Sequence, residues 1–340
     1  MNNLFVCHTQ ANLLLACGLV KKRFVNDDNF LIVFVDFILK EDVKKNLIKT
    51  FTQVLFLTGT FPATNKKWGK KIQRYPHDLK LIKQFCNKKI DRLFEVCDEA
   101  IPELYILKKL YHENSQLDAI WLEDGSYPYF QNTINRTGLK KNNFLIQLRK
   151  FVFRNILGYG KCYDFRGDFM GSNYLLRKAY LTFPKDYRKE YDKKEIIPIT
   201  DEEFFIGLQT LYPSQEQFSL KNNSALLVLD KLDVYSDIDK IKSIVKEIKE
   251  RYHPLYYKYH PREESKLDEL SDCEELDRAV GVEFFYSASY GKKVTVIGIK
   301  STSLQNAIKM GFNTISYAKQ ADECSNDILT FYKNIGIKIY

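Results

Sequence analysis

The sequence predicts an α/β protein made of two Rossmann-like domains that face a central cleft. Strand-like apolar runs alternate with helix-like segments in both halves of the chain, and a strongly charged segment, residues 185–203, separates them. With 340 residues, 45% of them hydrophobic, the chain has the length and the apolar content for two cores. We therefore predict a first domain over residues 1–184 and a second over residues 185–340, with the charged segment as the linker.

The first half follows the order of a parallel α/β sheet. Its expected strands are continuous apolar runs, and its expected helices carry apolar residues at helical spacing. The expected strands cover residues 4–7, 30–37, 54–57 and 119–122, and the expected helices cover residues 11–22, 78–86 and 101–112. Because ligands bind beyond the carboxyl ends of the strands in such sheets, the residues directly after each strand are candidates for chemistry.

The second half repeats this pattern. Its expected strands cover residues 225–229, 255–259 and 294–299, and its expected helices cover residues 238–251 and the segment that ends at residue 310. Two similar α/β halves that face one another suit an enzyme that holds one substrate in each domain.

Composition and charge exclude several classes of protein. The longest apolar candidate for a membrane span, residues 30–39, is interrupted by Asp36, and the N-terminus has no basic residue before its short apolar run, so we expect neither a span nor a signal peptide. We expect a cytoplasmic protein. The seven cysteines are scattered without a CxxC pair, which predicts reduced thiols. On the net charge of +9 alone, nucleic acid, small anions and anionic membranes are all possible partners.

The residues Glu123, Asp124 and Gly125 directly follow the strand expected at residues 119–122. A carboxylate in a cleft acts as a general base when burial raises its pKa. The alternative is an acidic turn in which Asp-Gly supports a backbone reversal. Against this alternative, Ser126 and two nearby tyrosines offer hydroxyls and rings to a sugar. The pattern does not distinguish which of the two carboxylates is the base.

A histidine followed by proline ends the strand expected at residues 255–259. His260 is held by the following Pro261 and offers a proton or a phosphate contact. The same dipeptide occurs at His253 and Pro254, between a helix and that strand, and there we expect a structural role.

The residues Ser301, Thr302 and Ser303 stand between an expected strand and an expected helix. Their hydroxyls and the first free amides of the helix would converge on one point, which favours phosphate. A simple helix N-cap is the alternative. Because His260 follows a strand of the same half, both motifs should open onto one crevice. Glu283 stands in an apolar setting and needs polar partners, either paired ribose hydroxyls or, equally, a lysine.

These motifs resemble those of the bacterial sialyltransferases of the glycosyltransferase B (GT-B) type, which include lipooligosaccharide, capsular and polysialic acid enzymes. The marks of those enzymes are an acidic-acidic-glycine motif, a histidine-proline motif and a downstream serine-threonine motif. Here they read Glu123-Asp124-Gly125, Lys258-Tyr259-His260-Pro261-Arg262-Glu263 and Lys300-Ser301-Thr302-Ser303-Leu304. The opening Leu4-Phe5-Val6-Cys7-His8-Thr9-Gln10 is also similar to the start of these enzymes, with Gln10 where a proline often stands.

The resemblance implies the GT-B architecture and an inverting sialyltransferase. Such an enzyme would transfer sialic acid from CMP-sialic acid to a hydroxyl of a cell-surface glycan, such as the terminal galactose of lipooligosaccharide or capsule. Glu123 or Asp124, in the acceptor-side domain, would deprotonate that hydroxyl, and His260 would protonate or hydrogen-bond the leaving phosphate. The other implied contacts to the substrates are Gly125, Ser126, Lys258, Pro261, Glu283, Ser301, Thr302, Ser303, His8 and Thr9.

We expect this chemistry to require no metal and no cofactor. The single phosphate of CMP can be stabilised by His, Ser, Thr and amide groups. The triplet Asp237-Ile238-Asp239 begins an expected helix instead of ending a strand, so it is interpreted as a pair of charges at a helix N-terminus.

Other functions and partners remain open at this point. The alternatives are a polysialyltransferase that extends a sialic acid chain, a GT-B glycosyltransferase with another nucleotide sugar, or a non-catalytic glycan- or nucleic-acid-binding protein. The basic residues 66–71 contain a single Trp68, so we expect no nucleic-acid partner. The basic amphipathic stretch at residues 144–154 predicts either a peripheral contact with the inner membrane or a soluble helix with a buried apolar side. No pattern in the sequence indicates an oligomeric state.

Overall fold

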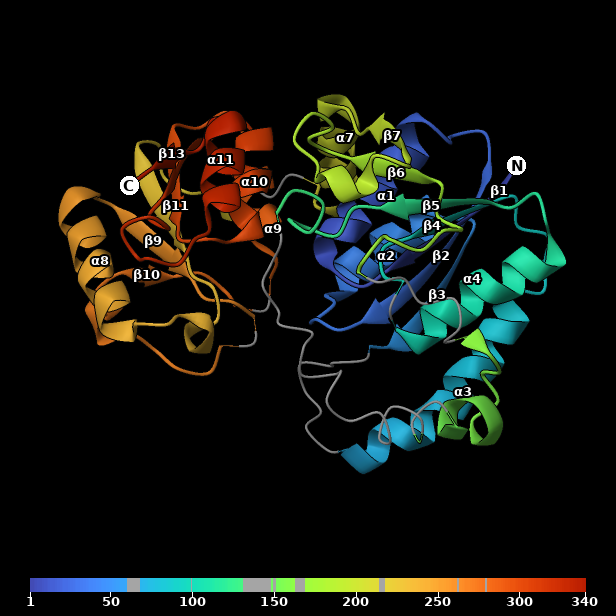
Figure 1. The fold of residues 1–340 in the computed structure, drawn as a ribbon. Coiled ribbons are helices and arrows are strands. Elements are labelled where there is room, and N and C mark those ends of the chain that lie inside the picture. Colours follow the sequence, from blue (N-terminus) through green and yellow to red (C-terminus); the bar gives the residue numbers. More distant parts are fainter. Residues whose placement is uncertain are drawn as a thin grey trace.

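The structure, a computed structural model, contains two parallel β-sheets, each covered by helices (Figure 1). It describes residues 1–59, 68–98, 100–130, 148, 151–162, 169–213, 218–261, 263–278 and 280–340. The first sheet has seven strands in the order β3-β2-β1-β4-β5-β6-β7, and the second has six in the order β10-β9-β8-β11-β12-β13. The predicted α/β fold with two Rossmann-like domains is confirmed.

The first sheet belongs to the N-terminal part of the chain, drawn mainly in blue and green in Figure 1. Its strands are β1 (Asn2–Cys7), β2 (Asp28–Val35), β3 (Gln53–Thr58), β4 (Arg92–Glu95), β5 (Asp118–Leu122), β6 (Lys178–Leu181) and β7 (Glu195–Pro198). Its helices are α1 (Gln10–Lys22), α2 (Glu41–Thr50), α3 (Trp68–Phe85), α4 (Ile101–Glu113) and α7 (Asp201–Leu211). The strand order reverses between β1 and β4, so the chain leaves these two strands in opposite directions and opens a crevice at their carboxyl ends.

The second sheet is built from the C-terminal part of the chain. Its strands are β8 (Ser224–Val228), β9 (Leu255–Lys258), β10 (Glu274–Glu275), β11 (Val294–Gly298), β12 (Asn313–Ser316) and β13 (Lys338–Ile339). Its helices are α8 (Ile238–Arg251), α9 (Val282–Ala288), α10 (Thr302–Lys309) and α11 (Asn326–Asn334). Here the order reverses between β8 and β11, which places a second crevice at the ends of those strands.

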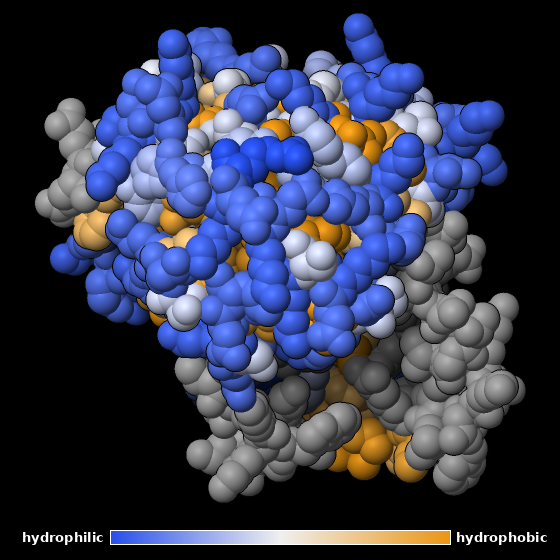
Figure 2. All heavy atoms as spheres, turned by 90° about the vertical axis from the view of Figure 1, so that its left-hand side faces the viewer, coloured by the Kyte–Doolittle hydropathy of each residue, from blue (hydrophilic) through white to orange (hydrophobic). Residues whose placement is uncertain are grey.

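Helix α8 is amphipathic, with one buried apolar side and one charged side that faces solvent. Ile241, Ile244, Val245 and Ile248 are buried against the second sheet, whereas Lys246 and other charged residues face solvent. The face of the molecule that carries α8 is accordingly largely hydrophilic (Figure 2). Within the described ranges, no helix is both long enough and apolar enough to cross a membrane.

The predicted linker at residues 185–203 is wrong, because this segment continues the first domain. It contains a short 3-10 helix, Lys189–Tyr191, and strand β7, which pairs in parallel with β6. Tyr191 is fully buried and stacks on Trp121 at a centroid distance of 4.7 Å. Strand β7 was not predicted because its apolar centre is only two isoleucines long and charged residues flank it. The division after residue 184 stays a prediction, and the first sheet extends past it to Pro198.

Helix α7 follows β7 and packs directly on α1, which keeps it with the first domain. The two helix backbones come so close that a Cβ atom on Gly207 would lie 2.0 Å from the carbonyl oxygen of Leu14. A Cβ on Gly18 would likewise lie 2.0 Å from the carbonyl oxygen of Glu203. The crossing therefore depends on glycine at both positions.

The two domains share an aromatic contact. Tyr129, from the loop after β5, stacks on Phe331 of α11 with a centroid distance of 4.6 Å and an interplanar angle of 4°. Phe183 packs edge-on against the same phenylalanine at 5.6 Å. Polar contacts flank this cluster: Lys309 lies 2.7 Å from Asp201 across the interface. The apolar core thus continues from one domain into the other.

Candidate active site

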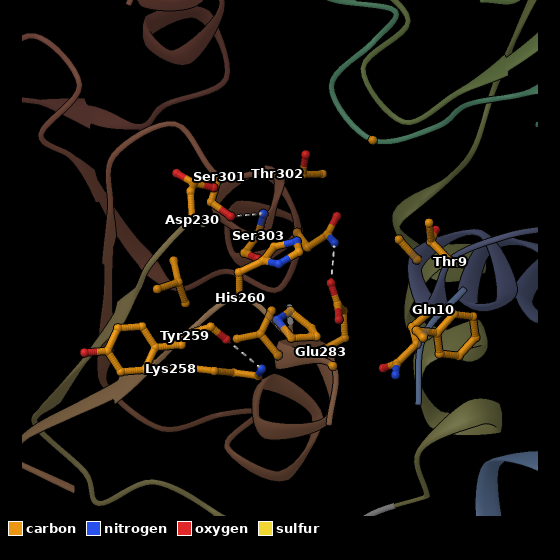
Figure 3. Close-up of a pocket in the computed structure, with 18 of the residues that line it drawn as sticks. Thr9, Gln10, Asp230, Lys258, Tyr259, His260, Glu283, Ser301, Thr302 and Ser303 are labelled. Atoms are coloured by element: carbon orange, nitrogen blue, oxygen red, sulfur yellow. Dashed lines mark hydrogen bonds between the residues drawn. The ribbon is translucent and has the colours of Figure 1, made fainter. Parts of the chain in front are cut away.

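A cleft of about 480 Å³ lies between the two sheets and is lined by both domains (Figure 3). The first domain contributes His8, Thr9, Gln10, Asp36, Asp124 and Gly125, which follow β1, β2 and β5. The second domain contributes Asp230, Lys258, His260, Glu283, Ser301 and Thr302, most of which follow or end β8, β9 and β11. The cleft is therefore where the carboxyl edges of the two sheets meet.

The two adjacent carboxylates after β5 have different environments. Glu123 is 6% exposed and accepts hydrogen bonds from the Thr182 amide and hydroxyl, both at 2.7 Å, and from the Tyr129 hydroxyl. Burial raises the pKa of Glu123 to about 7, against the opposing effect of these bonds. Its carboxylate is turned toward β6 and does not line the cleft. The structure therefore places Glu123 outside the lining of the cleft.

Asp124 lines the cleft, and one of its oxygens is held by a buried asparagine. Asn12 Nδ2 donates to Asp124 Oδ1 at 3.2 Å and to the Glu123 carbonyl oxygen at 3.3 Å. Burial raises the pKa of Asp124, while the Asn12 hydrogen bond and the nearby charge of His8 oppose that rise. A carboxylate with a raised pKa in a cleft has the character of a general base.

Gly125 brings the two domains together beside Asp124. Its φ is +55°, a region that favours glycine, and a Cβ there would lie 3.1 Å from the Thr302 hydroxyl oxygen. The turn after the acidic pair thus touches the start of α10 in the other domain. Ser126, the next residue, is 7% exposed and does not line the cleft.

His8 and Thr9 lie at the carboxyl end of β1. The His8 imidazole stacks on Phe34 and forms ion pairs with Asp36, at 3.3 Å, and with Glu103, at 2.5 Å. Burial works against a charged ring, but Glu103 and Asp36 outweigh it and raise the pKa of His8 to about 10. The Thr9 hydroxyl caps α1 by accepting from the Asn12 amide at 3.2 Å. Both residues line the cleft, and the contacts described above are made within the first domain.

On the opposite wall, Lys258, His260 and Pro261 mark the end of β9. In Figure 3, the half-buried His260 side chain lies between Ser303 and Glu283 and is directed into the cleft. Lys258 is 4% exposed, and its amine donates to the carbonyl oxygens of Tyr259 and Arg278, each at 3.3 Å. Burial lowers the pKa of Lys258 to about 8.

His253 and Pro254 lie before β9, at the other end of the strand from the cleft. Their predicted position between a helix and that strand is confirmed. Asp237 caps α8 by accepting from the amides of Asp239 and Lys240, as expected for a charge pair at a helix start.

The serine-threonine motif begins α10. Ser301 is the N-cap, and its hydroxyl accepts from the Ser303 amide at 3.3 Å. Thr302 and Ser303 form the first turn, and all three residues of the motif line the cleft. The motif therefore caps the helix, as one alternative predicted, and it also lines the cleft.

Glu283 lies in the first turn of α9, with 8% of its surface exposed. Its Oε1 accepts from the Asn306 amide at 2.8 Å. An asparagine therefore satisfies one oxygen of Glu283, the charge of Glu283 also acts on Lys258, and Glu283 lines the cleft.

The sequence analysis did not assign Asp230 and Asn306, which line the cleft, or Asn12, which is buried beside it and bonds to Asp124. Asp230 lies two residues beyond β8, and burial raises its pKa while bonds from Tyr235, Lys300 and Ser301 oppose that rise. Its position after an expected strand was a signal for it. The signal for Asn12 was its place three residues after Thr9, the spacing of a capping box. Asn306 had no signal of this kind.

Some predicted features lie outside the described residues. These are the basic residues 66 and 67, Arg262 of the histidine-proline motif, and most of the stretch at residues 144–154. In the described part of that stretch, Phe153 is buried against Tyr75, and Phe151 is 57% exposed. Among the described residues, no group of three or more His, Cys, Asp or Glu side chains is placed to hold a metal ion.

Two Rossmann-like domains with a ligand cleft between their carboxyl edges define the GT-B class of glycosyltransferases, and solved structures share this fold. A sialyltransferase GT-B domain from Photobacterium damselae is 14% identical with a TM-score of 0.51, over 99% of this chain and 97% of that one. The glycotransferase of kitacinnamycin is 10% identical with a TM-score of 0.52, over 100% of this chain and 86% of that one. A UDP-GlcNAc 2-epimerase from Methanocaldococcus jannaschii is 10% identical with a TM-score of 0.53, over 100% and 88%.

The chain belongs to the alpha-2,8-polysialyltransferase family, whose model matches residues 3–317. No curated protein sequence matches the chain. The resemblance to bacterial sialyltransferases, which rested on three short motifs, is therefore confirmed at the level of the family and of the fold.

Proposed function

We propose that this protein is an inverting sialyltransferase that transfers sialic acid from CMP-sialic acid to a hydroxyl at the end of a sialic acid chain. One observation carries the proposal. A single cleft is lined by Asp124 of the first domain and by His260 and the start of α10 of the second. A general base thus lies opposite a group of donors suited to a leaving phosphate.

The family supports the choice of acceptor in this proposal. The description of the matching model names an alpha-2,8-polysialyl product, so a sialic acid end is the first candidate acceptor. The terminal galactose of lipooligosaccharide or capsule, which the motifs alone favoured, becomes the second candidate. A donor other than CMP-sialic acid is the third.

Asp124 is the base in this proposal. Its second carboxylate oxygen takes the proton of the acceptor hydroxyl. At the same time, the oxygen of that hydroxyl attacks the anomeric carbon of sialic acid. The bond between that carbon and the phosphate oxygen of CMP breaks, and its electron pair stays on the phosphate. Glu123 is excluded from this role by its bonds to Thr182 and Tyr129, which hold it away from the cleft.

His260 and α10 receive the leaving group. The His260 imidazole protonates or hydrogen-bonds the departing phosphate oxygen. The hydroxyls of Ser301, Thr302 and Ser303, at the positive N-terminal end of α10, bind its other oxygens. Because these donors stabilise the charge that develops on one phosphate, the proposal needs no metal or cofactor. The acceptor attacks the anomeric carbon from the side of Asp124, opposite to the leaving phosphate held by the other domain. The configuration of the anomeric carbon is therefore inverted.

The remaining cleft residues are assigned to the rest of the donor. Glu283 would bind the ribose hydroxyls with the oxygen that Asn306 leaves available, and Lys258 and Pro261 would lie close to the nucleotide. The backbone of Gly125 is proposed for the carboxylate of sialic acid. Ser126 is buried behind it and would contribute through its backbone. His8 and Thr9 would line the acceptor side.

The decisive experiment measures transfer from CMP-sialic acid to oligosialic acid and to lactose, with mass spectrometry of the products. We expect extension of oligosialic acid. We expect Asp124→Asn to lower the rate of transfer by about 10²–10⁴-fold, the usual contribution of a general base, without a loss of stability. Glu123→Gln is the matched control, because it changes the neighbouring carboxylate and should retain far more transfer.

His260→Ala separates chemistry from binding. We expect it to slow the release of CMP both with and without acceptor, since it acts on the leaving group. Activity with UDP-sugars alone would overturn the proposal, as would full transfer by Asp124→Asn.

A further inference from the structure

Asn12 connects the start of α1 to the loop that carries Asp124. It is fully buried, and it is the third residue of the helix. Its carboxamide oxygen accepts from the backbone amides of Thr9, at 3.1 Å, and His8, at 3.3 Å. Its carboxamide nitrogen donates to Asp124 Oδ1 and to the carbonyl oxygen of Glu123. Both protons and both lone pairs of the carboxamide are therefore used.

This arrangement gives the side chain two separable functions. The oxygen completes the capping box with Thr9 and so stabilises the first turn of α1. The nitrogen acts on the neighbouring strand end, since β5 delivers Asp124 to the cleft. The carboxamide serves both functions because it carries an acceptor oxygen and a donor nitrogen on one planar group.

The contact to Asp124 determines which oxygen faces the substrates. In the described part of the chain, Asn12 is the side chain that donates a hydrogen bond to this carboxylate. With Oδ1 engaged inside the first domain, Oδ2 is the oxygen that remains for the cleft. A carboxylate free to rotate would spend much of its time in other orientations, at a cost to the rate.

We propose that Asn12 is a positioning residue of the transfer reaction, which orients the Asp124 carboxylate so that its Oδ2 meets the acceptor hydroxyl. This inference rests on the proposed role of Asp124 as the base. It adds a residue outside the three motifs, and it makes the start of α1 part of the catalytic apparatus.

Asn12→Asp removes the donor and keeps the oxygen of the capping box. An aspartate retains the oxygen that accepts from Thr9 and His8, but while ionised it cannot donate to Asp124, and it adds a like charge. We expect kcat for oligosialic acid extension to fall by about 10- to 100-fold, less than the whole contribution of a base. We also expect the acidic limb of the pH profile of kcat/KM to move up by about one pH unit, because a like charge disfavours the ionised base.

The control is Thr200→Ala, which removes a capping box of the same kind from α7 in the same domain. It should lower the unfolding temperature and leave kcat and the acidic limb unchanged. If Asn12→Asp does not fold, as judged by circular dichroism, Asn12→Ala decides by the same pH profile, since it removes the donor without adding a charge. A profile that matches wild type in the folded variant overturns the inference.

The premise and the inference fail in different ways. Transfer that persists in Asp124→Asn shows that the base is wrongly assigned. An inactive Asp124→Asn together with a wild-type profile for Asn12→Asp leaves the base in place and removes only the role of Asn12.

Discussion

Glu123 and Asp124 are neighbours in the chain, yet their carboxylates lie in different surroundings. Successive side chains beyond a strand point to different sides, so one enters the network of Thr182 and Tyr129 and the other faces the cleft. Burial raises the pKa of both residues. A raised pKa therefore does not identify the base, and the direction of the side chain does.

His8 provides a prediction on the dependence of stability on pH. Its ordinary pKa of 6.5 is raised to about 10 in the folded chain, because Glu103 and Asp36 favour the charged ring more than burial opposes it. Between these values the folded chain binds more protons than the unfolded chain, so stability falls as pH rises. The stabilisation from His8 should be complete below about pH 6.5 and be lost as pH approaches 10.

The measurement is urea unfolding of wild type and His8→Gln at several pH values. We expect the difference in unfolding free energy to be largest at the acidic end and to shrink toward pH 10. A difference that grows with pH would contradict the ion pairs with Asp36 and Glu103.

At the scale of elements, the crossing of α1 and α7 locates the first domain's last helix. The crossing sets the position of α1, and through Asn12 it also supports the loop of Asp124. Close contact between two backbones leaves no room for adjustment by rotamers.

Gly207→Ala should therefore destabilise the protein. Alanine favours an isolated helix over glycine by about 1 kcal/mol, but a Cβ at 2.0 Å from the Leu14 carbonyl oxygen requires α7 to move. We expect a net loss of about 1–3 kcal/mol, the usual range for overpacking, measured by urea unfolding. Ser243→Ala on the exposed side of α8 is the control and should change stability by less than about 0.5 kcal/mol. An increase in stability in Gly207→Ala would show that the helices are not in contact.

At the scale of the whole molecule, the aromatic contact between the domains is linked to the catalytic loop. The ring of Tyr129 stacks on Phe331, and its hydroxyl donates to Glu123, the residue before Asp124. The domain contact is thus connected through Tyr129 and Glu123 to Asp124, the proposed base. The same tyrosine serves packing through its ring and loop geometry through its hydroxyl.

Phe331→Ala tests this link. Removing a buried phenylalanine should cost about 3–5 kcal/mol and should also lower kcat, because Tyr129 loses the surface that holds it. Phe312→Ala is the matched control: it removes a buried phenylalanine that packs on Tyr286 within the second domain. Thermal unfolding and transfer kinetics of both variants should show similar losses of stability and a loss of kcat in Phe331→Ala alone. Equal kcat values in the two folded variants would contradict the link.

Much of the fold was predictable because its signals are local. Strands β1, β2, β5, β8 and β11 are apolar runs, and each carries a cleft residue at or near its carboxyl end. Strands β7, β10 and β13 are short or charged, and they form by pairing with a neighbour already in place. These strands depend on pairing with a neighbouring strand, and their own residues carry little strand signal. The linker prediction at residues 185–203 was wrong for this reason.

By itself the sequence determined the α/β class, the two-domain architecture and the positions of the three motifs after their strands. These features depend on hydrophobic periodicity and turn residues, which are local signals that span only a few neighbouring residues. Only the tertiary structure decided that Asp124 and not Glu123 faces the cleft, that Asn12 holds it, and that α7 belongs with α1. Each of these depends on contacts between segments far apart in the chain, since Asn12 and Asp124 are 112 positions apart and meet only when the parallel sheet brings β1 and β5 to the same edge.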